Sequence, residues 1–305
     1  MVGLLLQALA RQPSLRRFAE SSRLGRRLSE RFVAGLELPQ ALEAAASCRR
    51  AGLATTLDHL GENVASPPEA AAAAAGAAAS LEALAARGLD ANISVKLTQF
   101  GLDVPGGGET LAGEHLRRLA RRARDLGAFI RVDMESSAYT EATLRLVAEV
   151  HAQDLPVGAV VQAYLHRSAA DIERLIAAGV RLRLVKGAYR EPAHVALQNK
   201  SEVDANFVRL LRRLLEAGNY PAIATHDPRM IAAAQACARE LRLSADRFEF
   251  QMLYGIRRDL QSGLRQQGWR VRVYIPYGVD WYPYFMRRLA ERPANLLFLL
   301  RNLAR

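Results

Sequence analysis

The sequence has few cysteines, few lysines and no long hydrophobic run. Its two cysteines, Cys48 and Cys237, are too few for a disulfide framework or a cysteine-rich zinc cluster, which indicates a reducing compartment, the cytoplasm. No stretch approaches the roughly 20 apolar residues that a membrane-spanning helix needs. The longest run of small apolar residues, Ala70–Ala79, is interrupted by Gly76 and suits a packed helix. The sequence therefore predicts a globular protein without a spanning segment.

The charge is strongly positive and consists almost entirely of arginine. The 305 residues carry a formal net charge of +11, and only Lys96, Lys186 and Lys200 are lysines, which leaves 39 arginines. This charge permits attraction to anions, including an anionic bilayer surface. A nucleic-acid binder concentrates its basic residues beside exposed aromatic residues or in a reading motif. Here the arginines are scattered, so we expect no nucleic-acid partner.

The first 50 residues differ in character from the rest. They are rich in arginine and serine, which is typical of a mitochondrial targeting segment, but Glu20 and Glu30 argue against that interpretation because such segments are poor in acid. We expect residues 1–50 to form a helical arm packed on the main domain. Residues 51–305 then form one catalytic domain.

From residue 52 onward, short apolar strands alternate with helices rich in alanine and leucine. Eight stretches have the length and composition of buried strands. They are Leu53–Leu57, Ile93–Leu97, Phe129–Val132, Gly158–Gln162, Leu182–Val185, Ala222–Thr225, Phe248–Met252 and Val271–Ile275.

This alternation predicts a parallel sheet, because parallel neighbours need crossover connections. Eight strand–helix units over about 250 residues match a closed (βα)8 barrel. The alternative is an open doubly wound sheet, but no Gly-x-Gly-x-x-Gly motif follows the first strand. We therefore predict an α/β fold with a (βα)8 barrel.

Polar residues cluster where the predicted strands end, and in such barrels the chemistry lies at that end. They are Asp58, His59, Glu62, Lys96, Asp133, Glu135, Gln162, Tyr164, Arg183, Lys186, Thr225, His226, Asp227, Gln251, Tyr274 and Tyr277. For Asp58 or Glu135 alone, the start of a solvated loop is as good an interpretation. No pair of histidines has the spacing of a helical metal site and no cysteine accompanies them, so we expect no metal.

The segment after the last strand carries a polar stripe at helical spacing. Trp281, Tyr284, Arg288 and Glu291 recur at steps of three and four residues, and Arg287 lies beside Arg288. Such a stripe is not typical of a hydrophobic core face. Two adjacent arginines with a tyrosine one turn earlier can bind a small carboxylate through charge-assisted hydrogen bonds. An arginine-rich surface helix is the alternative.

Seven segments, taken in order, resemble the proline dehydrogenase family. They are VDMES at Val132–Ser136, VVQAY at Val160–Tyr164, RLVKGAY at Arg183–Tyr189, ATHD at Ala224–Asp227, FEFQMLYG at Phe248–Gly255, VYIPYG at Val273–Gly278 and YFMRRLAER at Tyr284–Arg292. The resemblance runs from about residue 50 to the end, and the length is similar to that of the small monofunctional bacterial form.

The resemblance implies a flavoprotein oxidoreductase on a distorted (βα)8 barrel. Members of this family use FAD to oxidise L-proline to Δ1-pyrroline-5-carboxylate, the first step of proline catabolism, by hydride transfer from proline C5 to flavin N5. A membrane quinone takes the electrons, and pyrroline-5-carboxylate dehydrogenase is the downstream enzyme. We accordingly expect a cytoplasmic protein that associates peripherally with the inner face of the cell membrane.

The resemblance also assigns roles to particular positions. Asp133 and Arg183 match the catalytic positions, with Arg183 near flavin N5. The positions that match flavin contacts are Met134, Gln162, Lys186, Gly187, Ala188, Thr225 and His226. Those that match the substrate site are Lys96, Tyr189, Leu253, Tyr274, Tyr284, Arg287 and Arg288. Glu62 matches an acid that can pair with Arg288 across the cavity. One departure is Arg190, where larger bifunctional relatives have tryptophan, and this puts flavin stacking on that side in doubt.

Two other functions remain as alternatives. A Schiff-base aldolase on the same barrel would use Lys96 or Lys186 as nucleophile. Acidic and basic neighbours would keep such a lysine protonated, which counts against this reading. The second alternative is a non-catalytic protein that binds a membrane surface, and the net charge of +11 is the one feature that favours it.

Overall fold

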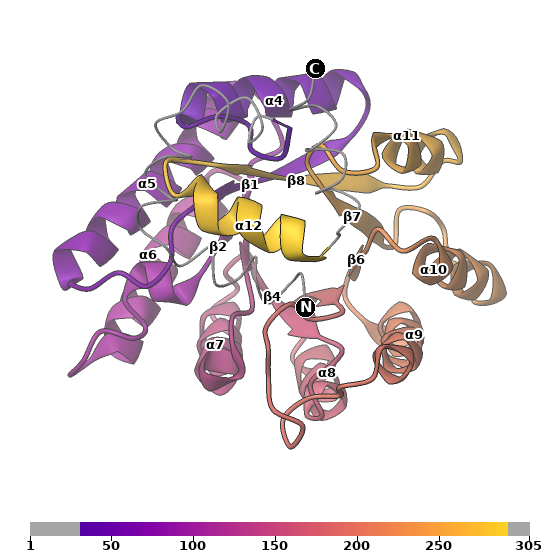
Figure 1. Ribbon diagram of the computed structural model, residues 1–305. Coiled ribbons are helices and arrows are strands. Elements are labelled where there is room, and N and C mark those ends of the chain that lie inside the picture. The colour runs from indigo at the N-terminus through magenta and orange to yellow at the C-terminus, as the bar shows by residue number, and fades with distance from the viewer. Residues whose placement is uncertain (1–30, 292–305) are drawn as a thin grey trace, which may run out of the picture.

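The computed structural model describes the backbone of residues 31–291 and the side chains of residues 31–286 (Figure 1). Helices and strands alternate along this part of the chain, with one short 3₁₀ helix, η1. The elements are α4 (Leu38–Arg50), β1 (Ala54–His59), α5 (Pro67–Ala86), β2 (Asn92–Val95), η1 (Leu97–Phe100), α6 (Gly108–Asp125), β3 (Phe129–Val132), α7 (Ser137–His151), β4 (Val157–Gln162), α8 (Ser168–Ala177), β5 (Arg181–Val185), α9 (Lys200–Ala217), β6 (Ala222–Ala224), α10 (Pro228–Glu240), β7 (Glu249–Leu253), α11 (Arg258–Gln266), β8 (Val271–Tyr277) and α12 (Trp281–Glu291).

The strands form a closed parallel barrel. Each strand pairs with the next along the chain, and β8 returns to β1, where Val273 lies opposite Thr55. The prediction of a (βα)8 barrel is thereby confirmed. Strand ends differ from the predicted ones by one or two residues because the predicted bounds followed apolar character, whereas the ladder of hydrogen bonds continues into the polar residues of β1 and β8.

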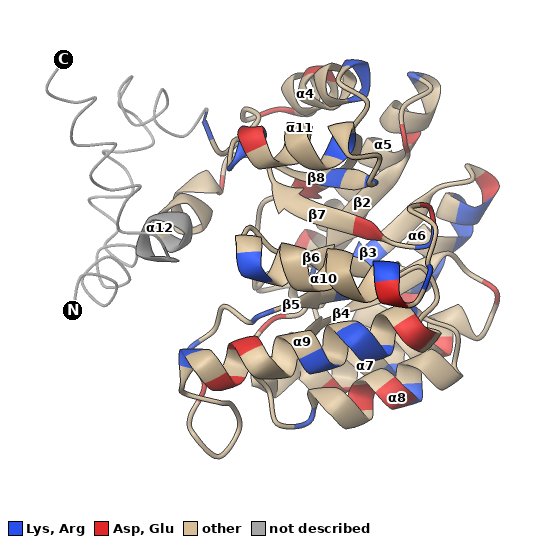
Figure 2. Ribbon diagram, turned by 90° about the vertical axis from the view of Figure 1, so that its right-hand side faces the viewer, with Lys and Arg blue, Asp and Glu red and all other residues tan. Residues whose placement is uncertain are grey.

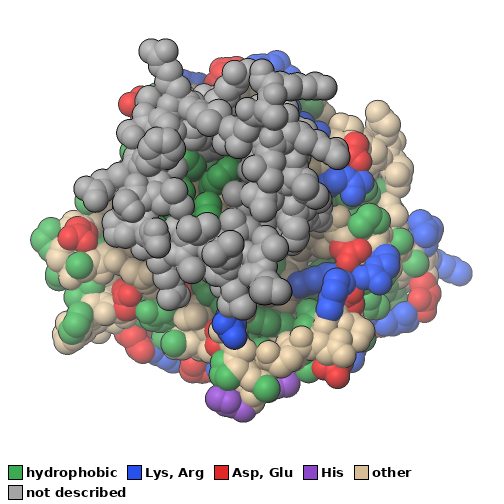
Figure 3. Space-filling model, viewed as in Figure 1, with side chains coloured by type: hydrophobic (Ala, Val, Ile, Leu, Met, Phe, Trp, Pro, Cys, Tyr) green, Lys and Arg blue, Asp and Glu red, His purple; other side chains and the backbone are tan. Residues whose placement is uncertain are grey.

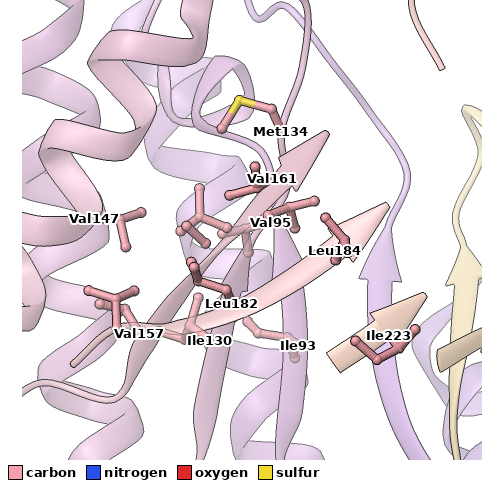
Figure 4. Packing of buried hydrophobic residues seen from close by; sticks show 14 of the residues in the cluster. Ile93, Val95, Ile130, Met134, Val147, Val157, Val161, Leu182, Leu184 and Ile223 are labelled. Carbon is pink, nitrogen blue, oxygen red and sulfur yellow. The ribbon is translucent and has the colours of Figure 1, made fainter. Parts of the chain in front are cut away.

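The main hydrophobic core lies between the strands and the surrounding helices. Alternate strand residues point outward, so that Ile93, Ile130, Leu182 and Ile223 pack beneath helices such as α7, which contributes Val147 (Figure 4). Each of these side chains is almost completely buried. The apolar contacts that stabilise the barrel are therefore concentrated on its outer face, between the strands and the helices.

The inside of the barrel, by contrast, is polar and charged. Near the amino ends of the strands, Arg272 Nε donates to Glu249 Oε1 at 2.8 Å, and Arg272 also pairs with Asp90. Nearby, Arg131 Nη1 donates to the carbonyls of Ala159 at 3.0 Å and Arg181 at 2.6 Å. Layers of bulky branched side chains usually fill such a barrel. In this barrel, charged and hydrogen-bonded side chains fill much of the interior instead.

Two helices depart from a regular alternation. Helix α4 precedes β1 and packs against β1 and β8, with Ala41, Leu42 and Ala45 in the main core. Helix α12 follows β8 and lies across the carboxyl ends of the strands rather than beside them, as Figures 1 and 2 show. The barrel is thus distorted at its closing unit. Of the predicted arm, residues 31–50 fall in the described part, and the division at residue 50 stays a prediction. None of the helices in the described part is long and apolar enough to cross a bilayer.

Candidate active site

A cavity of about 710 Å³ opens at the carboxyl ends of the strands. Its wall includes all fifteen candidate residues whose side chains the structure describes: Glu62, Lys96, Asp133, Met134, Gln162, Arg183, Lys186, Gly187, Ala188, Tyr189, Thr225, His226, Leu253, Tyr274 and Tyr284. Figure 3 looks onto this face and shows Lys and Arg side chains gathered at one side of it. The volume lies within the range of small-molecule and cofactor sites.

The carboxylate of Asp133, just beyond β3, joins three functional side chains. Its Oδ1 accepts a hydrogen bond from Arg183 Nη1 at 2.6 Å, and its Oδ2 accepts one from the Tyr274 hydroxyl at 2.7 Å. Lys96 Nζ lies 3.7 Å from the same Oδ2. Burial, together with the nearby Asp133, raises the pKa of Tyr274, so its hydroxyl remains a donor. Asp133 therefore fixes a guanidinium, a phenol and an ammonium around one point of the cavity.

Asp58, at the end of β1, is a closer partner of Lys96 than Asp133. Lys96 Nζ donates to Asp58 Oδ1 at 3.1 Å, and both side chains are almost completely buried. Burial alone would lower the pKa of Lys96, but Asp58 and then Asp133 raise it above its ordinary value. Lys96 is consequently a charged ammonium, which does not suit a Schiff-base nucleophile. The interpretation of Asp58 as the start of a solvated loop was wrong, because the residue faces into the barrel.

Arg183, on β5, donates hydrogen bonds to three other parts of the barrel. Besides the bond to Asp133, its Nη2 donates to Ser94 Oγ on β2 at 3.1 Å and its Nε donates to Gln251 Oε1 on β7. The guanidinium also lies over the ring of Tyr274, 5.3 Å from its centroid. These contacts fix the plane of the guanidinium, which still lines the cavity.

Glu135 is buried beside the cavity rather than solvated. Thr98 Oγ1 donates to Glu135 Oε1 at 2.6 Å, and the Thr98 backbone N–H donates to Oε2 at 3.3 Å. The Glu135 backbone carbonyl accepts a hydrogen bond from Gln162 Nε2 at 2.9 Å, which orients Gln162 in the cavity wall. Burial raises the pKa of the Glu135 carboxyl to about 7.

A cluster of charges lies at the β5–β6 side of the mouth. Lys186 Nζ donates to Asp227 Oδ2 at 2.8 Å and to Asp204, which also receives Lys200 and Arg229. Although burial opposes it, the hydrogen bond from Lys186 lowers the pKa of Asp227 to about 2. Three cations surround two carboxylates, so the cluster keeps a net positive charge. Lys200, which the sequence did not single out, also lines the cavity.

Close backbone packing shapes the loop that follows β5. Gly187 has a φ of +120°, and a Cβ atom there would come within 2.2 Å of the Tyr164 ring. Tyr164 is in turn fixed by its backbone N–H, which donates to the Lys186 carbonyl at 2.9 Å. Further round the barrel, at the ends of β6 and β7, the backbone N–H of Leu253 donates to His226 Nε2 at 2.9 Å. The loop residues Gly187, Ala188 and Tyr189 thus occupy a defined part of the wall.

Helix α12 differs from the prediction in one respect. Trp281 is not part of a polar stripe but is buried, with Phe285 and Phe32, in a second hydrophobic cluster. The helix needs this apolar anchor because it lies across the barrel mouth instead of on the main core. Tyr284 lines the cavity as expected. The side chains of Arg287 and Arg288 lie outside the described residues.

Residues that act across strands were the hardest to find from the sequence. Gln251 and Asp58 appeared only as members of a ring of polar residues, whereas Glu249 and Arg272 gave no signal because they precede the strand ends. The described residues contain no group of three or more histidine, cysteine or acidic side chains that could hold a metal ion.

The fold and the cavity define the class of protein as a (βα)8-barrel enzyme with a charged site at the carboxyl ends of its strands. The family model described as proline dehydrogenase matches residues 41–301, and the chain belongs to that family. It is 42% identical over 297 residues to proline dehydrogenase 1 of Bacillus subtilis subsp. natto, covering 97% of this chain and 96% of that protein. It is 43% identical over 280 residues to proline dehydrogenase of Deinococcus radiodurans, covering 90% of each.

Solved structures include proteins with a similar fold. The crystal structure of proline utilization A from Bdellovibrio bacteriovorus, inactivated by N-propargylglycine, matches with a TM-score of 0.80 and 27% identity. The match covers 88% of this chain but only 33% of that chain. The chain therefore spans about a third of the length of this larger relative.

Because the pKa of Glu135 is raised, we predict that the stability of the folded protein depends on pH through this residue. A buried carboxyl favours its neutral form, so the folded state loses stability relative to the unfolded state as pH rises from about 4.5 to about 7. Glu135→Gln has no charge; its carbonyl oxygen can still accept from the Thr98 backbone N–H, and its NH₂ group can donate to Thr98 Oγ1, which reverses the direction of that bond. We expect the variant to gain up to about 3 kcal/mol relative to the wild type over this pH interval. Urea-induced unfolding at pH 5, 6 and 8 measures the difference.

The control for this prediction is Glu43→Gln, which changes an exposed glutamate paired with Arg50. The difference between this variant and the wild type should not follow the same trend. A stability difference for Glu135→Gln that is constant from pH 5 to pH 8 would contradict the prediction.

Proposed function

We propose that this protein is an FAD-dependent proline dehydrogenase, which oxidises L-proline to Δ1-pyrroline-5-carboxylate. The observation that carries the proposal is the Asp133 carboxylate, which joins Arg183, Tyr274 and Lys96 in the cavity of a chain that belongs to this family. The cavity offers cations to the carboxylate of a small amino acid and an apolar wall to its ring.

The residues present fit a flavin dinucleotide. An elongated cofactor with a planar ring and a pyrophosphate needs hydrogen-bond donors for the ring edge and positive charge for the phosphates. Arg183 supplies planar donors deep in the cavity, while Lys186, Lys200 and Arg229 give its rim a net positive charge. When bound, FAD supplies the ring whose N5 accepts the hydride that leaves C5 of proline. The residues that would hold it are Met134, Gln162, Arg183, Lys186, Gly187, Ala188, Thr225 and His226.

For the substrate, we propose a carboxylate clamp and a ring pocket. Lys96, Arg287 and Arg288 bind the carboxylate through charge-assisted hydrogen bonds, and Tyr189, Leu253, Tyr274 and Tyr284 enclose the five-membered ring and exclude water. Asp58 and Asp133 keep Lys96 charged, which supports its role as an anion-binding group. The same charge counts against the aldolase alternative. Glu62, which lines the mouth, acts as the gate by pairing with Arg288.

The electron acceptor and the location of the protein are further parts of the proposal. We infer that a membrane quinone reoxidises the enzyme, that residues 1–50 form an arm beside a catalytic barrel of residues 51–305, and that the protein binds peripherally to the inner face of the cell membrane. The basic N-terminal stretch supports attraction to anionic lipid. From membership of the family we also infer that pyrroline-5-carboxylate dehydrogenase is the downstream enzyme that uses the product.

The direct test of this function is anaerobic titration of the purified protein with L-proline. The protein should be yellow, and proline should bleach its flavin absorbance, whereas amino acids without the five-membered ring should not. A protein that is colourless and cannot be reconstituted with FAD, or whose flavin proline does not reduce, would contradict the proposal.

The same sample tests the acceptor. After bleaching, a quinone analogue should restore the flavin absorbance faster than oxygen does. Adding vesicles with anionic lipid should retain the protein at low salt and release it at high salt, because exposed charges are screened. Fast reoxidation by oxygen alone, with no response to quinones or vesicles, would remove the membrane quinone from the proposal.

A second prediction concerns the arginine pair. Arg287→Met and Arg288→Met each remove a charge-assisted hydrogen bond to the substrate carboxylate, so the KM for proline should rise about ten- to hundredfold with a smaller change in kcat. Lysine should not restore binding, because a point charge cannot replace a bidentate guanidinium. Affinity for tetrahydro-2-furoic acid should fall in parallel, and FAD affinity should stay the same.

The matched control is Arg212→Met, on the exposed face of α9, where Arg212 pairs with Glu240. This variant should have wild-type kinetics. If Arg287→Met and Arg288→Met behave like Arg212→Met, the two arginines belong to a surface helix and the carboxylate clamp needs other residues.

A further inference from the structure

We propose that Gln251 is a positioning residue, which sets the orientation of the Arg183 guanidinium for the reaction. Gln251, on β7, accepts a hydrogen bond from Arg183 Nε and donates one through its Nε2 to Glu249 Oε1, two residues earlier on the same strand. All three side chains are almost completely buried. The inference rests on the proposed function in one respect, the part that Arg183 plays beside the bound flavin.

The neighbours of Gln251 fix which way its amide points. Glu249 is ion-paired with Arg272, whose Nε donates to Glu249 Oε1 at 2.8 Å. Although burial opposes it, Arg272 lowers the pKa of Glu249, so this carboxylate is ionised and can only accept hydrogen bonds. Arg183, on the other side, can only donate. Gln251 must therefore present its NH₂ group to Glu249 and its carbonyl oxygen to Arg183.

Glutamate and methionine, which have a similar length, show why an amide suits this position. Glutamate at position 251 could accept from Arg183, but when ionised it would have no proton to donate to Glu249. Methionine has a similar length and can neither accept nor donate with comparable strength. The neutral amide of Gln251 also lies between two ion pairs. Arg272 pairs with Glu249 on one side of it, and Arg183 pairs with Asp133 on the other.

The contact completes a three-point support for Arg183. Its Nε donates to Gln251 on β7, its Nη1 to Asp133 beyond β3, and its Nη2 to Ser94 on β2. Three acceptors on different strands determine the plane of the guanidinium, whereas two would leave it free to rotate about the axis between them. The two remaining N–H groups are then held in a fixed direction for a ligand.

The first variant is Gln251→Met, which removes both hydrogen bonds. The rate of flavin reduction at saturating proline should fall about tenfold, the effect of one charge-assisted hydrogen bond. The KM should change less than threefold, because the side-chain hydrogen bonds of Gln251 go to Arg183 and Glu249, which are not part of the proposed carboxylate clamp. Gln235→Met is the control: this half-buried glutamine on α10 donates a hydrogen bond to Gln267 at the surface of the barrel, and the kinetics of the variant should match the wild type.

The second variant, Gln251→Glu, tests orientation rather than packing. When its carboxyl is protonated, it accepts from Arg183 and donates to Glu249, as glutamine does. The reduction rate should therefore be close to that of the wild type at low pH and fall as the new carboxyl ionises. The ratio of variant to wild-type rate should show one extra ionisation between pH 5.5 and 8.5. A ratio independent of pH, or wild-type rates for Gln251→Met, would overturn the inference.

A measurement without turnover separates this inference from the proposed function. In the ¹⁵N NMR spectrum of the FAD-loaded protein, the Nε–H resonance of Arg183, assigned with Arg183→Lys, should be protected from exchange with water. Gln251→Met should abolish the protection and Gln251→Glu should retain it. An unchanged resonance in Gln251→Met would overturn the role of Gln251 even if proline reduces the flavin. Failure of proline to reduce the wild type would overturn the proposed function while the resonance still decides the role of Gln251.

Discussion

The rest of the site depends on the hydrogen bonds and the ion pairs of the Asp133 carboxylate, which lies in the cavity wall. Arg183 and Lys96 place two positive charges on almost completely buried side chains, and a buried charge is stable only when it is paired and hydrogen-bonded. Asp133 and Asp58 balance these charges, with Arg183 at 2.6 Å from Asp133 and Lys96 at 3.1 Å from Asp58. Without Asp133, the guanidinium, the phenol of Tyr274 and the ammonium would have no common acceptor.

This arrangement affects the whole barrel. Charged and polar residues continue from the mouth through Gln251 to Glu249 and Arg272 near the amino ends of the strands. The interior therefore contributes less hydrophobic stabilisation than a barrel filled with branched side chains, and the apolar residues between strands and helices (Figure 4) must supply it. Helix α12 can leave the ring of helices because α4 packs against β1 and β8, and α12 has its own apolar anchor in Trp281.

The sequence predicted the features that depend on local pattern. Alternating strands and helices predicted the barrel, and twelve of the sixteen polar residues at the predicted strand ends line the cavity, whereas His59, Glu135, Tyr164 and Tyr277 do not. What it could not give were the pairings across strands, because these depend on the register of the closed sheet. Lys96 is nearer to Asp58 than to the expected Asp133, and Gln251 joins Glu249 to Arg183, although no local pattern marks either contact. Likewise, Trp281 was assigned to a polar stripe because the second hydrophobic cluster forms only when α12 lies across the mouth.

The most direct test of this account is the rate of flavin reduction by proline in Asp133→Ala, measured together with the flavin content of the purified variant. Removing the carboxylate leaves Arg183 and Tyr274 without the acceptor of their hydrogen bonds, and leaves Lys96 without one of its two ion-pair partners. The account predicts that flavin stays bound, while the reduction rate falls about ten- to hundredfold, since at least one charge-assisted hydrogen bond that orients the reacting groups is lost. A variant that reduces its flavin at the wild-type rate, or that loses flavin but has normal rates after reconstitution, would contradict it.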